Sequence, residues 1–184
     1  MSATLLVVCG APGAGKTTAV ESATAGLLRA PMPRDEYPPR EALIDESGAV
    51  RVVELGVRRP PFSGADTLSM SVVGRAEEYL AALPEAPRVV VADGARLSNR
   101  RFLAAGVALG MTVVLVYVDN PDAGRWRARR AEEMGSAGQS ESWARGRATA
   151  ARNLASSPPD GVEVVTVSGP GAAADEIRNI IESG

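Results

Sequence analysis

The sequence contains no histidine, and this absence excludes several kinds of chemistry. There can be no Ser-His-Asp triad, no histidine-ligated metal and no histidine general base, so any catalytic base must be a carboxylate. The only cysteine, Cys9, excludes an internal disulfide and a cysteine-based zinc site. We expect Cys9 to be a small core residue, with a reactive thiol as the alternative.

Long hydrophobic runs and net positive charge are also missing. No apolar run reaches about 18 residues, so we expect a soluble, intracellular protein without a membrane partner. The net charge of −2 provides no global positive field for nucleic acid, although local basic patches can still attract it. A chain of 184 residues is long enough for one α/β core, so we expect a single domain over residues 1–184.

Lysine occurs once, at Lys16, and the other basic side chains are all arginine. Lys16 lies in a run that matches the phosphate-loop pattern G-x-x-x-x-G-K-[ST], formed by Gly10, Ala11, Pro12, Gly13, Ala14, Gly15, Lys16 and Thr17. A continuous apolar run at 3–9 predicts a buried strand before the loop, and 17–28 predicts a helix after it. We therefore expect ATP and Mg²⁺ as cofactors, with Lys16 on the β- and γ-phosphates, Thr17 on the metal, and Thr18 among the nucleotide-binding residues.

A second strand-to-loop element is predicted at 88–94, where an apolar run ends in Asp93. An acidic residue at the carboxyl end of a buried parallel strand adjoins the phosphate loop and can orient Mg²⁺. The next residue is Gly94, so the glutamate that polarises water in motor-type ATPases is missing. This favours transfer to a bound acceptor over hydrolysis.

Residues 56–69 have the composition of a substrate-binding loop, with paired arginines, paired prolines and a small-residue turn. The candidate substrate contacts in this loop are Arg58, Arg59, Phe62, Ser63 and Asp66. Alternatively, Asp66 or Thr67 only caps a helix predicted over 68–83. After the second strand, Arg96, Arg100 and Arg101 either contact phosphate or substrate or form a solvated face, and Ser98 is the expected N-cap of a helix ending near Leu109.

Residues 122–155 predict two basic helices separated by a Gly/Ser-rich break, which we call the lid region. Seven arginines lie between 125 and 152, and we assign Arg125 to nucleotide binding and Arg129 to catalysis. The alternative is a solvated basic helix pair. Trp126 and Trp143 either anchor the core or stack on a base, and we expect at least one to be in the core.

The remaining pattern alternates strands and helices. Four prolines at 31–39 predict a loop, 42–55 a hairpin, 111–118 and 162–167 strands, and 171–183 a helix. The predicted fold is α/β of the P-loop NTPase/kinase type, with a five-stranded, mainly parallel sheet, helices on both faces and an arginine-rich helical lid. The site is expected at the carboxyl ends of the strands.

Three classes of function compete. A GTPase switch in its standard form needs an N-K-x-D element. Because Lys16 is the only lysine and belongs to the phosphate loop, the sequence has no such element. An ATP-driven motor or binding module normally needs a carboxylate for water, repeats or a partner domain, and none is evident. A small phosphotransferase matches the chain length, the basic lid and the acceptor loop.

Two segments resemble bacteriophage-type P-loop kinases: residues 58–70, with Arg58-Arg59 and Phe62 to Met70, and the strand-end run Asp93 to Phe102. Those enzymes phosphorylate 5-hydroxymethyluracil already incorporated in DNA. The resemblance implies that Asp66 or Asp93 accepts the hydroxymethyl proton and that loop and lid arginines contact DNA phosphates. Because DNA-acting enzymes usually have a basic footprint and this chain is net acidic, a free nucleoside, nucleotide or other small hydroxyl compound stays the alternative acceptor.

Overall fold

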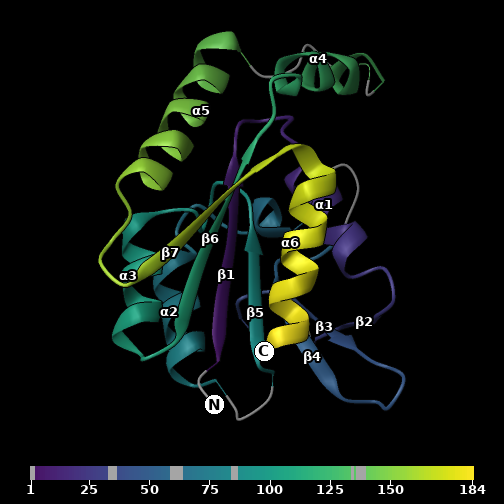
Figure 1. The fold of residues 1–184 in the computed structure, drawn as a ribbon, viewed down its shortest axis with the longest axis vertical. Coiled ribbons are helices and arrows are strands. Elements are labelled where there is room, and N and C mark those ends of the chain that lie inside the picture. Colours follow the sequence, from purple (N-terminus) through teal and green to yellow (C-terminus); the bar gives the residue numbers. More distant parts are fainter. Residues whose placement is uncertain (1–2, 33–36, 59–63, 84–86, 134, 136–139) are drawn as a thin grey trace.

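The computed structural model describes residues 3–32, 37–58, 64–83, 87–133, 135 and 140–184. Its centre is a seven-stranded sheet in the order β2-β3-β4-β5-β1-β6-β7 (Figure 1). The strands are β1 (Thr4–Gly10), β2 (Leu28–Pro31), β3 (Arg40–Ile44), β4 (Val50–Leu55), β5 (Val89–Asp93), β6 (Thr112–Asp119) and β7 (Val162–Ser168). The helices are α1 (Lys16–Ala23), α2 (Val73–Ala81), α3 (Arg100–Ala108), α4 (Ala123–Glu133), α5 (Glu141–Ser156) and α6 (Gly169–Ser183), and η1 (Gly64–Thr67) is a 3₁₀ helix.

The five strands from β4 to β7 in this order are parallel, which confirms the predicted fold class. β1 lies between β5 and β6 and is covered on both faces, which explains why its sequence is continuously apolar. The carboxyl ends of β1 and β5 lie side by side, because Val8 pairs with Asp93. The phosphate loop and the strand-end aspartate are therefore neighbours.

The predicted count of five strands is wrong, because β2 and β3 extend the sheet as an antiparallel edge. β3 and β4 form the predicted hairpin, whose turn is closed by Asp45. The helix predicted over 17–28 ends at Ala23, and 28–31 is a strand instead of helix and loop. Pro31 is compatible with this strand because β2 lies at the edge, where a missing N–H costs no central ladder hydrogen bond.

Helices cover both faces of the sheet, as predicted (Figure 1). One core cluster joins the sheet to α2, α3 and α5, with Phe102 and Leu154 among its buried side chains. The other joins it to α1 and α6, where Ile177 and Ile181 form the buried stripe expected from their spacing. Cys9 is buried in the first cluster, which confirms its prediction as a core residue.

Two predicted helix starts are wrong. The helix predicted over 68–83 is η1 followed by a shorter α2, whose N-cap residue is Val72 and has no side-chain cap. Neither Asp66 nor Thr67 therefore caps it. The N-cap of α3 is Asn99, which accepts a hydrogen bond from the Phe102 amide, whereas Ser98 donates to the Gly94 carbonyl.

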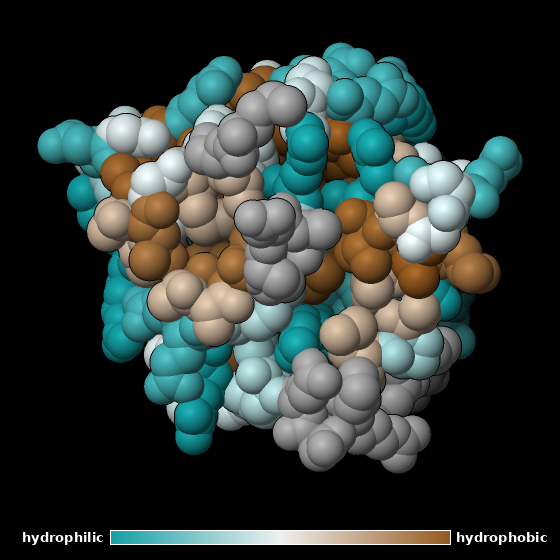
Figure 2. All heavy atoms as spheres, turned by 90° about the horizontal axis from the view of Figure 1, so that it is seen from below, coloured by the Kyte–Doolittle hydropathy of each residue, from teal (hydrophilic) through white to brown (hydrophobic). Residues whose placement is uncertain are grey.

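The amino ends of the parallel strands lie opposite the lid helices α4 and α5 (Figure 1). Figure 2 shows this end of the molecule, where apolar and hydrophilic side chains both reach the surface. Within the described ranges, no helix combines the length and apolar character that crossing a membrane requires.

Candidate active site

The phosphate loop connects the end of β1 to the start of α1. Gly10, Gly13 and Gly15 have positive φ values of 152°, 86° and 90°, which residues with a side chain rarely adopt. Close packing also requires glycine, because a Cβ at Gly13 would lie 2.2 Å from the Ala123 carbonyl oxygen of α4. The lid helix α4 is therefore in contact with the loop that is expected to hold phosphate.

Lys16 is the first residue of α1, and its side chain folds back over the loop. Its Nζ donates to the carbonyl oxygens of Gly10 at 3.2 Å and Ala11 at 3.0 Å. Burial lowers the pKa of Lys16, and the nearby carboxylates of Asp66 and Asp93 raise it in the opposite direction. The ammonium group thus lies over the loop carbonyls and within the electrostatic influence of two acidic side chains.

Thr17 and Asp93, the two predicted metal ligands, are in direct contact. Thr17 Oγ1 donates to Asp93 Oδ2 at 2.7 Å, and the Ala65 amide donates to Asp93 Oδ1 at 3.2 Å. Asp93 is only 1% exposed, and burial raises the pKa of its carboxyl group, although the Thr17 and Ala65 hydrogen bonds lower it. A bound divalent cation would favour the ionised form.

This donor set is compatible with Mg²⁺, which takes few protein oxygens and completes its shell with phosphates and waters. Across the described residues, no group of three or more His, Cys, Asp or Glu side chains could hold a metal by itself. A cation here would therefore depend on the nucleotide phosphates, with Thr17 and Asp93 as its protein partners.

Three glycines bring η1 against the ends of β4 and β5. A Cβ at Gly56 would lie 1.9 Å from the Gly64 carbonyl oxygen, and one at Gly64 would lie 1.6 Å from Asp93 Oδ1. A Cβ at Gly94 would lie 2.7 Å from Asp66 Oδ1, so the Asp66 carboxylate rests against the strand end. Asp66 is exposed and makes no hydrogen bond or ion pair to any residue in the described part of the chain.

A cavity of about 800 Å³ joins these groups to the lid. On the sheet side it is lined by the phosphate loop, Asp66 and the segment from Gly94 to Ser98. On the lid side it is lined by α4 and α5. The lining lid side chains include Trp126, Arg127, Arg129, Arg130, Trp143 and Arg147.

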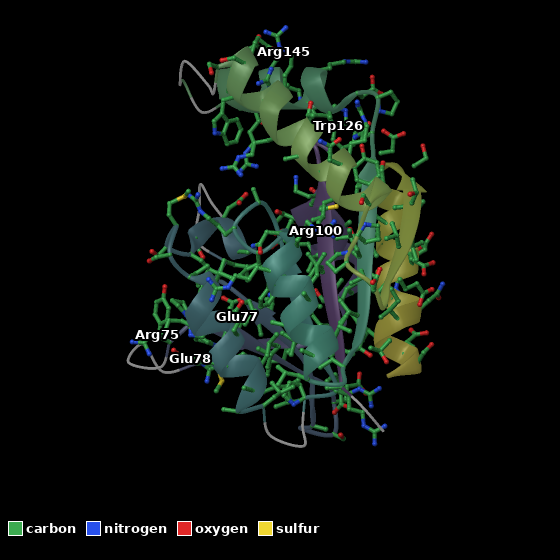
Figure 3. The ribbon with its side chains drawn as sticks, turned by 90° about the vertical axis from the view of Figure 1, so that its left-hand side faces the viewer. Arg75, Glu77, Glu78, Arg100, Trp126 and Arg145 are labelled. Atoms are coloured by element: carbon green, nitrogen blue, oxygen red, sulfur yellow. The ribbon has the colours of Figure 1, made fainter. Side chains whose placement is uncertain are left out.

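The lid arginines divide into two groups. Arg127, Arg129, Arg130 and Arg147 line the cavity, and Arg127 forms an ion pair with Glu141 that joins the two lid helices. Arg125, predicted to bind nucleotide, instead lines a separate surface pocket on α4. Arg145 and Arg152 are exposed, and Arg145 lies at the outer end of α5 (Figure 3).

The expectation of a core tryptophan is wrong. Trp126 is half-buried and packs near Gly15, since a Cβ there would lie 3.3 Å from Trp126 Cζ3. Trp143 is 39% exposed, and Arg147 Cζ lies 5.6 Å from the centroid of its ring. Both rings line the cavity, and neither belongs to a core cluster.

The candidate substrate contacts are distributed unevenly. Asp66 and Arg96 line the cavity, whereas Arg58 pairs with Glu21 and Glu54. Arg59, Phe62 and Ser63 lie outside the described residues. Two further arginines point elsewhere: Arg100 donates to the Ser157 carbonyl, and Arg101 pairs with Glu77 on α2.

Two features of the site were not predicted from the sequence. Asn120, after β6, donates from Nδ2 to the Ala14 carbonyl at 3.3 Å and so ties the phosphate loop to the neighbouring strand. Glu54 is a buried carboxylate that interacts with arginines of two different segments. The polar residue following an apolar strand was a usable signal for Asn120, whereas Glu54 looked like an ordinary alternating strand residue.

A family model described as P-loop Nucleotide Kinase3 matches residues 1–183. No curated protein matches the chain. Among solved structures, the G domain of the T. maritima FeoB iron transporter is 14% identical, with a TM-score of 0.37 and coverage of 98% of this chain and 97% of that one. That likeness is too low to carry an argument. Because the family model spans almost the whole sequence, the chain belongs to the P-loop Nucleotide Kinase3 family.

Proposed function

We propose that the protein is an ATP- and Mg²⁺-dependent kinase that transfers the γ-phosphoryl group to a hydroxyl acceptor. One observation carries the proposal: Lys16 and Thr17, whose hydroxyl donates to the buried Asp93, line the same cavity as Asp66, a carboxylate without a hydrogen-bond or ion-pair partner among the described residues. Phosphoryl transfer needs mainly positioning and charge stabilisation, together with a group that orients the nucleophile. The cavity contains candidates for each of these tasks.

The phosphate end of the reaction is assigned to the loop and its neighbours. Loop amides and the amino end of α1 hold the phosphates, and Lys16 exchanges its two carbonyl partners for phosphate oxygens. Thr17 and Asp93 would hold Mg²⁺, which when bound would supply positive charge against the charge that develops on the phosphates. The lid arginines, Arg129 among them, supply positive charge above the transferred group.

Asp66 is a better candidate for the acceptor base than Asp93. Both oxygens of Asp93 accept hydrogen bonds, and its side chain is buried, so it is committed to the metal end. The Asp66 carboxylate is exposed to the cavity and lies near Lys16. In the reaction, the acceptor oxygen forms its bond to γ-phosphorus while the bond to the β–γ bridging oxygen breaks, and the hydroxyl proton goes to Asp66.

For the acceptor we propose the hydroxymethyl group of 5-hydroxymethyluracil in DNA. The two segments that resemble the bacteriophage-type kinases meet at the site, because η1 packs against the end of β5 through Ala65 and Asp93. The five arginines that line the cavity, four of them from the lid, provide a local basic surface despite the net charge of −2. A free nucleoside, nucleotide or small hydroxyl metabolite is the alternative acceptor, and a P-loop ATPase or binding module is the alternative without transfer.

The test is transfer of labelled γ-phosphate from ATP to a panel of acceptors. The panel contains DNA with 5-hydroxymethyluracil, unmodified DNA and the matched free nucleosides. Asp66→Asn should lower the turnover by about 10²- to 10⁴-fold, because it removes the base but keeps the side-chain volume. The matched control is Asp160→Asn, which should retain turnover because Asp160 is an exposed carboxylate in the loop before β7.

Label in the modified DNA alone would support the DNA acceptor. Label only in a free nucleoside would keep the kinase and replace the acceptor. Asp66→Asn at wild-type turnover would remove Asp66 from the proposed mechanism.

A further inference from the structure

Trp143 occupies an unusual position for a large aromatic residue in a chain with 4% aromatics. It lies in the first turn of α5, where Ser140 caps the helix by accepting a hydrogen bond from the Trp143 amide. Its ring lines the cavity, remains 39% exposed and has the Arg147 guanidinium 5.6 Å from its centroid. The local fold therefore presents an aromatic ring and a cation to the cavity.

The rest of α5 explains how this ring is held. Ala151 and Leu154 are buried in the core cluster on that face of the sheet, and α5 packs against β1 and β6. Trp143 and Arg147 precede Ala151 by two turns and one turn, so they continue the same helix face beyond the core and over the cavity. Core packing anchors the carboxyl-terminal half of α5, and Trp143 and Arg147 in the amino-terminal half line the cavity.

The two tryptophans line the same cavity from different helices, α4 and α5. Trp126 packs beside the phosphate loop, where Gly15 is also close to Pro170 of α6. Trp143 shares the cavity wall with Arg147, Ala150 and Ala151 on α5. The same cavity is lined by Asp66, Gly94, Ala95, Arg96 and Ser98, which belong to the acceptor side of the proposed site. Trp126 therefore lies beside the phosphate loop, whereas Trp143 lines the same cavity as Asp66 from α5.

We propose that Trp143 and Arg147 form a stacking platform for a planar acceptor, and that the acceptor hydroxyl is carried on a nucleobase. This inference rests on the proposed kinase function, because the position of Asp66 defines the acceptor side. An aromatic face with an adjacent guanidinium binds a flat π-system, whereas an aliphatic hydroxyl compound would need hydrogen-bonding partners. Stacking on an aromatic side chain is worth about 1–3 kcal/mol per base, equivalent to roughly a 5- to 150-fold change in affinity.

The first experiment measures binding by calorimetry, separately from turnover. The probes are 5-hydroxymethyl-2′-deoxyuridine, a single-stranded oligonucleotide with that base, the same oligonucleotide in duplex, and 2-deoxyribose as a non-planar hydroxyl compound. For a planar probe, Trp143→Ala should raise the dissociation constant by about 5- to 150-fold, and Trp143→Phe should restore most of the affinity. Affinity for ATP should stay within about twofold of wild type in both.

Tyr37→Ala is the matched control, since Tyr37 is a 47% exposed aromatic residue that does not line the cavity. A second readout uses Trp126→Phe, which leaves Trp143 as the only tryptophan. Its fluorescence should be quenched by planar probes and unaffected by 2-deoxyribose.

Tight binding of the oligonucleotide alone would identify a polynucleotide as the source of the stacked base. Equal binding of the nucleoside would identify a free nucleoside as that source. No binding of any planar probe, or equal affinity in wild type and Trp143→Ala, would overturn the platform. Stacking without phosphoryl transfer would overturn the kinase function and leave a nucleobase-binding platform.

Discussion

Glu54 is predicted to make the protein less stable as the pH rises. Its side chain on β4 is 1% exposed, and one of its oxygens, Oε1, has no hydrogen-bond partner among the described residues. The other, Oε2, accepts from Arg29 Nη1 of β2 at 2.6 Å and from Arg58 Nη2 at 3.5 Å. Burial, with the charges of Asp93 and Glu41, raises the pKa of Glu54 from 4.5 to about 7 despite the Arg29 charge.

The sign and size follow from proton linkage. Between pH 4.5 and 7 the folded chain keeps a proton that the unfolded chain has lost, so the free energy of unfolding falls as pH rises. With these two pKa values, the raised pKa of Glu54 lowers the free energy of unfolding by about 1 kcal/mol at pH 5 and by about 3 kcal/mol at pH 8. Above pH 7 the cost levels off, because Glu54 is then ionised in both states.

Glu54→Gln tests this prediction because glutamine mimics the neutral carboxyl group. Urea unfolding at pH 5 and pH 8 should show the stability of the variant rising relative to wild type by about 2 kcal/mol over this range. The control is Glu163→Gln, an exposed carboxylate on β7, whose difference from wild type should stay constant with pH. Parallel pH profiles for Glu54→Gln and wild type would contradict a raised pKa for Glu54.

Two further predictions concern packing near the site. Gly64→Ala should destabilise the protein by more than about 2 kcal/mol and weaken Mg²⁺-dependent nucleotide binding, because its Cβ would collide with Asp93 Oδ1 and φ is +63°; unchanged urea unfolding and Mg²⁺ titrations would contradict this. Burial raises the pKa of the Cys9 thiol to about 12, so iodoacetamide at pH 8 should label Cys9 only after unfolding, and rapid labelling of the native protein would contradict its burial.

The central strands were predictable because burial on both faces leaves a direct mark on the sequence. β1, β5 and β6 are continuous runs of branched apolar residues, and each ends at a polar or glycine residue that turns the chain. The phosphate loop was equally readable, since its glycines and Lys16 have a fixed spacing. Both signals are local in the sequence.

The sheet edge and the helix ends were not predictable in the same way. β2 is a four-residue strand that depends on pairing with β3, and its own sequence, with Pro31 at the end, reads as a loop. At α3, Ser98 was the expected cap, and only the backbone geometry places the neighbouring Asn99 on the Phe102 amide. Tertiary pairing decides the first case, and one residue of register decides the second.

The assignment of charged side chains needed three-dimensional information. The sequence around Arg58, Arg96 and Arg101 gives no sign that their roles differ. In the structure Arg58 pairs with Glu21 and Glu54. Arg96 lines the cavity, and Arg101 pairs with Glu77. Partners such as these lie on other elements, so local sequence carries no trace of them. The same reason explains why at least one of Trp126 and Trp143 was expected in the core.

The proposed kinase activity can be tested by following the γ-phosphate of labelled ATP with Mg²⁺ and 5-hydroxymethyluracil DNA, in wild type and Lys16→Ala. We predict that wild-type protein moves the label to the acceptor with little release as inorganic phosphate. Lys16→Ala should keep the wild-type unfolding profile and lose transfer, because the β- and γ-phosphates lose their point charge. Transfer by Lys16→Ala at the wild-type rate, or wild-type label found only in inorganic phosphate across the whole acceptor panel, would contradict these predictions.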